Sequence, residues 1–292
     1  MNGPRTPVKF DVPKGACDTH VHVYLDPEKY PFSPNRVYTP PVATEADLSD
    51  LQDYLGFNRL VVVQPSNYGT DNSATLQGVK YFGPDRARAV VVIDDKTSNE
   101  ALDEMHEIGA RGVRVNLELD GVSDPIEAGH RLWAMAERLK PRGWHVQTYT
   151  RLRILDAVKE QLAALPVPIV FDHFAGAQAE GGVDQPGFKA VLDLVRSGKA
   201  YVKISAAYRS SKSPGYSDLT PVAQALIAAN PDRILWGSDW PHPDGSRGKP
   251  FEISPFYPID DGLVLNLLET WAPDSDVRQQ ILVDNPGRLF GF

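Results

Sequence analysis

Cysteine is almost absent from this chain of 292 residues, which contains only Cys17. A single cysteine cannot form an intramolecular disulfide, and so low a content is typical of proteins from a reducing compartment. The chain also lacks an apolar run of the roughly 18–20 residues that cross a bilayer. Residues 1–13 are polar and rich in proline, unlike a signal peptide. We therefore expect a soluble, cytoplasmic protein that does not act at a membrane.

Basic residues are in deficit as well, with 30 Lys and Arg against 38 Asp and Glu, a net charge of −8 and a pI near 5.4. Binding of nucleic acid relies on clustered Lys and Arg, so this balance argues against nucleic acid as a partner. A site for a small anion would need its own arginines, because the overall field is unfavourable to anions.

What the chain does contain is a series of short apolar runs rich in β-branched residues. Runs of this kind are typical of strands that are buried on both faces in a parallel sheet. They begin mostly about 25–30 residues apart, which leaves room for one helix between each pair. The eight predicted strands are residues 16–23, 59–64, 88–93, 112–117, 144–149, 167–172, 200–205 and 233–238.

Helical spacing of apolar residues fills several of the gaps, at residues 99–109, 124–140, 154–165, 188–195 and 220–229. Strands that alternate with helices predict either an open doubly wound sheet or a closed barrel. No G-x-G-x-x-G or P-loop motif follows a strand, which weakens the nucleotide-binding open sheet. We therefore predict one α/β domain over residues 1–292, a (β/α)8 barrel.

Long loops rich in proline or polar residues follow three predicted strands, at residues 24–44, 64–72 and 241–258. Barrel enzymes carry their chemistry at the carboxyl ends of the strands. His20 and His22 lie at such an end, two residues apart, so both should point into the barrel. Two imidazoles placed in this way could bind a metal ion or donate hydrogen bonds to a developing oxyanion.

Asp239 closes the last predicted strand, where a carboxylate can serve as a general base. Its alternative role is to cap a turn. Asp172 and His173 end the sixth strand, and because neighbours on a strand face opposite sides, we expect only one of them to point inward. His242 follows Asp239 in a proline-rich loop, where a histidine can also be a simple loop residue.

A further group of polar residues should surround the same end of the barrel. Each could instead form an ordinary surface or loop contact, but together they would suit a small molecule with hydroxyl and carboxylate groups. The predicted substrate-binding residues are Ser66, Asn67, Arg114, Asn116, Gln147, Tyr149, Arg209 and His242.

In combination, these motifs resemble the amidohydrolase superfamily, and within it the branch of 2-pyrone-4,6-dicarboxylate lactonases and sugar-lactone enzymes. The resemblance rests on Asp18-Thr-His-Val-His22, on residues 63–72 and 111–116, on Asp172-His173, and on residues 236–243 and 285–292. It implies an amidohydrolase-type barrel that acts on a lactone, with Asp239 as base and later acid. His20, His22 and His173 would then stabilise the oxyanion.

The departures from the superfamily pattern bear on metal binding. The fourth strand has no lysine for a two-metal site, and Gln147 and Tyr149 stand where a metal-binding histidine would end the fifth strand. The resemblance to the lactonase branch implies catalysis without a cofactor. The alternative is one Zn²⁺ held by His20, His22 and Asp239, since a catalytic zinc takes about three protein ligands.

The substrate is indicated by one further departure. Asp120 stands where the pyrone-dicarboxylate lactonases have a second arginine, so a clamp for a second carboxylate is weakened. The pattern is most similar to D-galactarolactone isomerases, which implies conversion of D-galactaro-1,5-lactone to the 1,4-lactone. There Arg114 and Arg209 would hold the carboxylate, while Ser66, Asn67 and Tyr149 orient hydroxyls. The alternatives are a lactone hydrolase and, more remotely, a non-catalytic sugar-acid-binding barrel. The sequence leaves the oligomeric state open.

Overall fold

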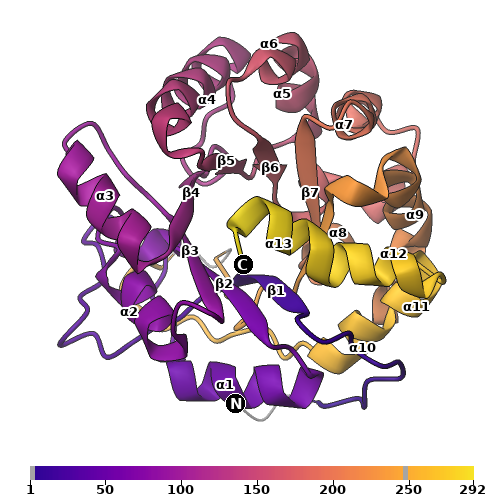
Figure 1. Cartoon of the computed structure of the whole chain (residues 1–292), viewed down its shortest axis with the longest axis horizontal. Coiled ribbons are helices and arrows are strands. Elements are labelled where there is room, and N and C mark those ends of the chain that lie inside the picture. The colour runs from indigo at the N-terminus through magenta and orange to yellow at the C-terminus, as the bar shows by residue number, and fades with distance from the viewer. Residues whose placement is uncertain (1–3, 246–248) are drawn as a thin grey trace.

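A sheet of eight parallel strands stands at the centre of the molecule, in the chain order β1 to β8 (Figure 1). The computed structural model describes residues 4–245 and 249–292. Every predicted strand is confirmed, with ends that differ by at most two residues. The strands are β1 Cys17–Val21, β2 Arg59–Val63, β3 Ala87–Val91, β4 Ala110–Val115, β5 His145–Thr148, β6 Ile169–Phe171, β7 Ala200–Ser205 and β8 Ile234–Gly237.

Helices surround the strands (Figure 1). The five predicted helices are present, although the segment 154–165 is two helices that meet at Val158 rather than one. The helices are α1 Glu45–Leu55, α2 Ser73–Phe82, α3 Asn99–Ile108, α4 Pro125–Leu139, α5 Leu152–Ala157, α6 Lys159–Ala164, α7 Phe188–Arg196, α8 Ala207–Ser210, α9 Thr220–Ala229, α10 Asp261–Asn266, α11 Leu268–Trp271, α12 Ser275–Gln279 and α13 Asn285–Phe290.

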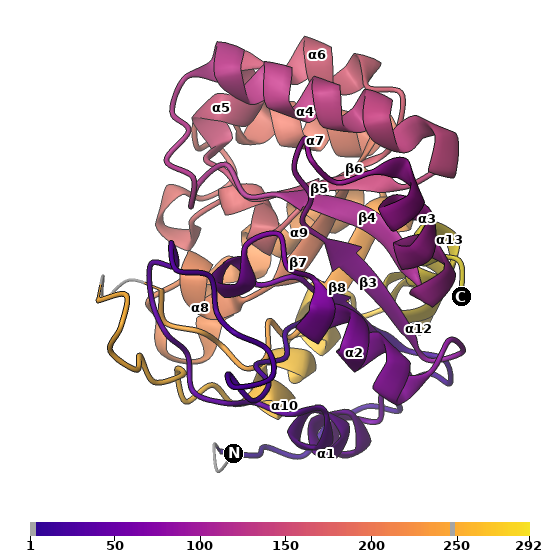
Figure 2. The same ribbon diagram turned by 90° about the vertical axis from the view of Figure 1, so that its left-hand side faces the viewer.

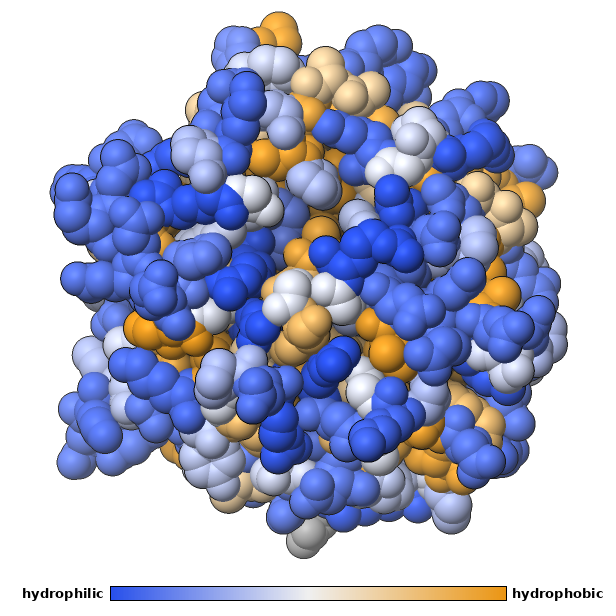
Figure 3. Space-filling view, viewed as in Figure 1, coloured by the Kyte–Doolittle hydropathy of each residue, from blue (hydrophilic) through white to orange (hydrophobic). Residues whose placement is uncertain are grey.

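Most of the hydrophobic core lies between the strands and this outer layer of helices. Helix α1 illustrates why such segments fold locally: Thr44 and Asp47 form a reciprocal capping box at its start, and Gly56 ends it in the left-handed conformation. Hydrophilic side chains cover most of the face seen in Figure 3, with apolar ones in the gaps between them. This distribution is that of amphipathic helices packed around a barrel. No helix in the described ranges is long and apolar enough to cross a membrane.

The two ends of the barrel differ in what covers them. Figure 2 shows the loops after β1 and β8 together on the left, and α13 on the right. The loops are joined by a parallel bridge between Thr39 and Ile253. At the opposite end, Phe290 of α13 packs with Cys17 and Tyr201 in a small apolar cluster inside the barrel. We call these two ends the mouth and the floor.

The barrel closes between β1 and β8 through the backbone of residues at the mouth. The His22 N–H donates to the Trp240 carbonyl at 2.8 Å, and the Asp239 N–H donates to the His20 carbonyl at 2.9 Å. Gly237 permits this approach, because a Cβ there would lie 2.7 Å from the His20 Cβ. We call this closure the seam.

Candidate active site

Three imidazoles at the mouth converge on one oxygen of Asp239. The Oδ1 atom lies 3.5 Å from Nε2 of His20, 3.4 Å from Nε2 of His22 and 3.8 Å from Nε2 of His173. All four side chains are buried. The sequence prediction that His20 and His22 both point into the barrel is therefore confirmed, and they lie beside the predicted base.

Strand β1 brings both histidines inward through an irregularity in its register against β2, between Asp18 and Val21. Cys17 faces the interior, within the floor cluster, and strict alternation would then point Val21 inward. Val21 instead packs in the outer core. The irregularity thus shifts the alternation by one residue, which places His20 and His22 inside.

The second oxygen of Asp239 is fully engaged. Oδ2 accepts a hydrogen bond from the Tyr208 hydroxyl at 2.6 Å and one from Nε of Arg209 at 3.0 Å. Burial alone would raise the pKa of Asp239, but Arg209 and then His173 outweigh burial and hold that pKa well below its usual value. Asp239 is therefore an ionised carboxylate with one fixed oxygen and one that faces the imidazoles.

Asp172 and His173 both point into the barrel, so the prediction that only one of them could do so is wrong. Strand β6 ends at Phe171, and His173 has a φ of 50°, in the left-handed region that few residues other than glycine adopt. The alternation rule holds only within a strand, and the chain has already turned here. Asp172 Oδ1 lies 3.2 Å from Nδ1 of His20.

A second layer of polar groups lies around Asp172. Its Oδ2 accepts from Nε2 of Gln147 at 3.1 Å and lies 3.3 Å from Nε of Arg114. Lys203 of β7 is completely buried beside it, with Nζ 3.8 Å from Asp172 Oδ1. Burial opposes ionisation of Asp172, yet the neighbouring cations Lys203 and Arg114 hold its pKa well below the usual range. This layer keeps two buried charges of opposite sign together.

A cavity of about 350 Å³ opens above these groups at the mouth. Most of the predicted site residues line it: His22, Ser66, Arg114, Asn116, Tyr149, His173, Arg209 and Asp239. His20 does not, because it lies behind Asp239 and is completely buried. The cavity is therefore lined by two carboxylates, of which Glu118 is paired with Arg151, by two imidazoles, by two guanidinium groups and by several neutral hydrogen-bonding groups.

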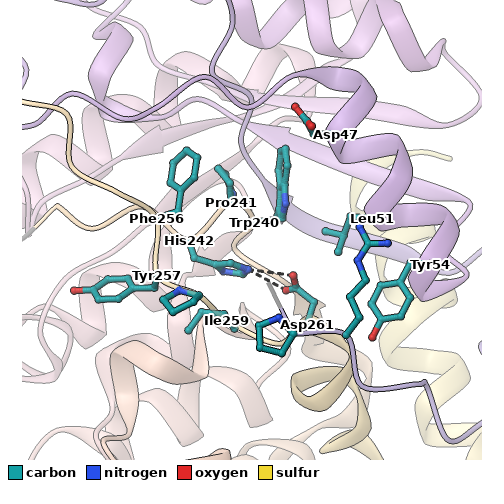
Figure 4. Close-up of a pocket in the computed structure, with 13 residues that line it drawn as sticks. Asp47, Leu51, Tyr54, Trp240, Pro241, His242, Phe256, Tyr257, Ile259 and Asp261 are labelled. Carbon is teal, nitrogen blue, oxygen red and sulfur yellow. Dashed lines mark hydrogen bonds and ion pairs between the residues drawn. The ribbon is translucent and has the colours of Figure 1, made fainter. Parts of the chain in front are cut away.

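Three predicted substrate-binding residues do not line this cavity. Asn67 is buried and donates to the Tyr38 carbonyl at 2.7 Å, so it holds the loop after β1. Gln147 lies in the layer beneath the cavity. His242 faces a different cavity, of about 250 Å³, where its Nε2 lies 3.1 Å from Asp261 (Figure 4). The chain turns at Trp240–Pro241, so the side chains of Asp239 and His242 enter different cavities.

Several residues at the site were not found from the sequence. Lys203 and Tyr208 are the most important, since the first touches His20 and the second holds Asp239. Ser205 contacts Nδ1 of His173 at 2.9 Å. One signal was available: Lys203 stands in the middle of the apolar strand β7, and lysine is almost never fully buried without a partner.

Asp120 lies outside the site cavity, in an adjoining cleft. It is half exposed and pairs with Arg131 at 3.3 Å. The carboxylate that the sequence sets in place of a second arginine is thus neutralised by a neighbour on α4, and it does not oppose an anion in the cavity directly.

Family matching agrees with this geometry, because the model of the Amidohydrolase family matches residues 17–292. The chain belongs to the amidohydrolase family. The 4-sulfomuconolactone hydrolase of Hydrogenophaga intermedia is 36% identical over 98% of this chain and 91% of its own length. The 2-pyrone-4,6-dicarboxylate hydrolase of Comamonas testosteroni is 35% identical over 97% and 92%.

The D-galactarolactone isomerase of Agrobacterium fabrum is similar too, at 32% identity over 95% of this chain and 91% of its own. Among solved structures, a protein from Agrobacterium tumefaciens superimposes with a TM-score of 0.77 at 29% identity, over 96% of this chain and 97% of that one. The resemblance to the lactonase branch is therefore confirmed, and it covers nearly the whole chain.

The spacing of the buried groups would also allow one metal ion. His20, His22 and Asp239 each offer one ligand atom, and these atoms lie within 4.8 Å of one another. Nδ1 of His22 donates to the Val63 carbonyl at 2.7 Å, which leaves a lone pair on Nε2 when the ring is neutral. An ion held there would polarise a carbonyl oxygen and lower the pKa of a bound water.

Proposed function

We propose that this amidohydrolase opens the ester bond of a small anionic lactone at the mouth of the barrel. The observation that carries the proposal is the convergence of three imidazoles on the free oxygen of Asp239, beside a cavity that also presents Arg114 and Arg209. A buried carboxylate base next to hydrogen-bond donors is what attack on an ester carbonyl needs. The names of the relatives, all lactone enzymes, support the same chemistry.

In the proposed mechanism, Oδ1 of Asp239 takes the proton of the attacking oxygen and later returns it to the ring oxygen that leaves. His22 and His173 line the cavity beside this oxygen. His173 would donate to the oxyanion from Nε2, and His22 would do so only as an imidazolium, because its Nδ1 proton is already donated to the Val63 carbonyl. His20, assigned to the oxyanion from the sequence, acts instead behind Asp239. This chemistry needs no metal ion, and we propose that the enzyme works without one.

The substrate carboxylate would bind the arginines. Arg209 uses Nε on Asp239 and Nη2 on the Pro243 carbonyl, which leaves others of its five N–H groups for an anion. Arg114 faces Asp172 through Nε and also lines the cavity. Ser66, Asn116 and Tyr149 line the same cavity and suit hydroxyl or carbonyl groups of the substrate.

The observations favour water over a substrate hydroxyl as the attacking nucleophile, which makes a lactone hydrolase the first candidate. The two relatives of higher identity are hydrolases. A cleft of about 780 Å³ adjoins the cavity and shares Val37, Ser66 and Asn116 with it. An isomerase must keep water from the ester, because the substrate's own hydroxyl attacks, and this cleft gives water a route to the site.

The isomerase that the sequence favours is the second candidate. Its support is the neutral group of Ser66, Asn116 and Tyr149 in the cavity, which suits a polyhydroxylated acid, and the similarity to D-galactarolactone isomerase. The Asp120 argument no longer separates the two candidates, because Asp120 is paired with Arg131 outside the cavity.

Isotope labelling would decide between them. The purified enzyme is incubated in H₂¹⁸O with 2-pyrone-4,6-dicarboxylate, 4-sulfomuconolactone or D-galactaro-1,5-lactone, and products are followed by NMR and mass spectrometry. An open-chain acid that carries ¹⁸O supports the hydrolase, and an unlabelled new lactone supports the isomerase. No conversion of any of the three would count against the proposed function. Turnover that is lost on chelation and restored by one equivalent of zinc would defeat the metal-free proposal.

A further inference from the structure

Lys203 is the one buried lysine of the site layer, and the mechanism above leaves it without a task. It stands in the middle of β7 and is completely buried. Its Nζ donates to the Thr19 carbonyl at 2.8 Å and to Oε1 of Gln147 at 2.7 Å, and lies 3.4 Å from Nδ1 of His20. Burial lowers the pKa of Lys203 to about 8, against the opposing effect of Asp172. Burial of an ammonium group costs folding free energy unless the group is paired, so the contacts of Lys203 need an explanation.

The contact with His20 fixes which of the two groups donates. An ammonium group has three donors and no acceptor, so Nδ1 of His20 must accept the hydrogen bond and therefore carries no proton. A ring without a proton on Nδ1 cannot be an imidazolium, so it is neutral. A neutral imidazole with a bare Nδ1 carries its proton on Nε2.

Asp172 would select the opposite tautomer, because its carboxylate could accept a proton from Nδ1. Its Oδ1 is 3.2 Å from that nitrogen, yet within residues 4–245 and 249–292 this oxygen has no hydrogen-bond partner. The distance is short, but the alignment is not that of a hydrogen bond. Lys203 is thus the better aligned of the two neighbours of Nδ1.

We propose that Lys203 is a positioning residue that holds His20 as its Nε2–H tautomer, so that this ring presents a donor to Oδ1 of Asp239. Nε2 of His20 lies 3.5 Å from that oxygen and has no hydrogen-bond partner in the described part of the chain, so the carboxylate is the charged group that a proton on Nε2 would face. A bare Nε2 would instead turn a lone pair toward the carboxylate and repel it. The tautomer rests on contacts alone, and its catalytic consequence rests on the proposed function.

The same tautomer bears on the metal question. A metal ion binds the lone pair of an imidazole nitrogen, so a proton on Nε2 removes His20 from the ligand set of His20, His22 and Asp239. Lys203 therefore favours a hydrogen-bonded site over a metal site at the mouth.

Nitrogen NMR tests the tautomer without any substrate. In metal-depleted enzyme labelled with ¹⁵N-histidine, the His20 signals are identified by their loss in His20→Gln. We expect Nε2 to be protonated in the unaltered enzyme, and the proton to move to Nδ1, toward Asp172, in Lys203→Met. Lys199→Met is the control, since Lys199 precedes the same strand and donates to the Leu165 carbonyl; it should leave the His20 signals unchanged.

A proton on Nδ1 in the unaltered enzyme overturns the proposal, and this measurement stands even if Lys203→Met does not fold. An unchanged tautomer in a folded Lys203→Met overturns it as well. Kinetics supply the second readout: loss of a donor to the base should lower kcat about 10- to 100-fold with KM changed less than about threefold. An equal loss of kcat in Lys199→Met would assign the effect to the fold. If no lactone is converted, the proposed function fails while the NMR result still decides the tautomer.

Discussion

The mouth and the floor of the barrel are built from the same eight strands, yet the floor is filled by apolar side chains and the mouth by ionisable ones. At the floor, Phe290, Cys17 and Tyr201 fill the interior with an apolar cluster. At the mouth, carboxylates and imidazoles fill it, and each depends on a charged or hydrogen-bonding neighbour. The floor can lose a contact and remain closed, whereas the mouth can lose one proton or one donor and change its chemistry.

Strand β7 shows this gradient within six residues. Tyr201 belongs to the floor cluster, Lys203 holds the buried layer beneath the cavity, and Ser205 contacts His173 at the mouth. All three face inward because residues two apart on a strand share a face. Strand β7 therefore contributes to the stability of the fold at the floor and to the protonation of the site at the mouth. Substitutions at the two ends should separate effects on unfolding free energy from effects on kcat.

The largest effect should come from Asp239→Asn at the mouth. Loss of the base should lower kcat by roughly 10²–10⁴ on whichever lactone is turned over, and the variant should still fold, because Asn keeps the shape of the side chain. Steady-state kinetics and thermal unfolding measure the two. Asp193→Asn, an exposed carboxylate of α7 paired with Lys189 and Arg196, is the control and should be fully active. An active Asp239→Asn enzyme would remove the base from the mechanism.

Phe290→Ala at the floor should lower stability far more than it lowers kcat. The ring is completely buried, so its removal should cost about 3–5 kcal/mol of unfolding free energy, measured by denaturant titration. The fraction that remains folded should lose only a small part of its kcat, because Phe290 reaches the mouth only through Lys203, whose Nζ lies 6.0 Å from the centre of the ring. A large loss of kcat at full occupancy of the native state would show that the floor and the mouth are coupled.

A methyl group at the seam should disturb both properties. Gly237→Ala would set a Cβ 2.7 Å from His20 Cβ and 2.9 Å from its backbone nitrogen, and such overpacking costs about 1–3 kcal/mol. The forced shift of His20 should lower kcat as well. In Gly287→Ala of α13, a Cβ meets nothing within 4 Å, and the helix should gain roughly 0.5–1 kcal/mol. Equal stability of the two variants would contradict the close approach at the seam.

The smallest effect concerns Asp18, whose pKa burial raises to about 6. Because the folded state holds this proton more tightly than the unfolded chain, Asp18 favours folding below pH 4, and that contribution is lost as pH rises through 6. Asp18→Asn has no such proton. The stability of this variant relative to the unaltered enzyme should rise by about 1 kcal/mol per pH unit between pH 4 and 6. A flat difference across this range would show that Asp18 titrates normally.

Much of the mouth could be predicted from the sequence, and the exceptions share a cause. The eight apolar runs, the shared face of His20 and His22, and the place of Asp239 at the end of a strand follow from local periodicity, because each strand is buried along its length. The turn of His173 into a left-handed conformation and the register irregularity in β1 break that periodicity. No pattern within one segment reports such a break.

Lys203 and His242 show a second reason why the sequence did not predict the whole site. The tasks of both depend on neighbours far away in the sequence: Lys203 donates to Thr19 from the opposite end of the chain, and His242 pairs with Asp261 beyond a turn. A histidine next to a predicted base suggests a shared site, but the turn decides which cavity each side chain enters. Only the folded barrel places them.

The seam also means that the site cannot be complete until late in the synthesis of the chain. His20 and Asp239 are 219 positions apart, yet their backbones bond to each other. At the usual pace of translation, the ribosome needs roughly 10–45 s to make the intervening chain. Through that interval His20 and His22 exist without the aspartate that they will surround. The arrangement of His20, His22 and Asp239 therefore cannot form before β8 has been made and lies beside β1.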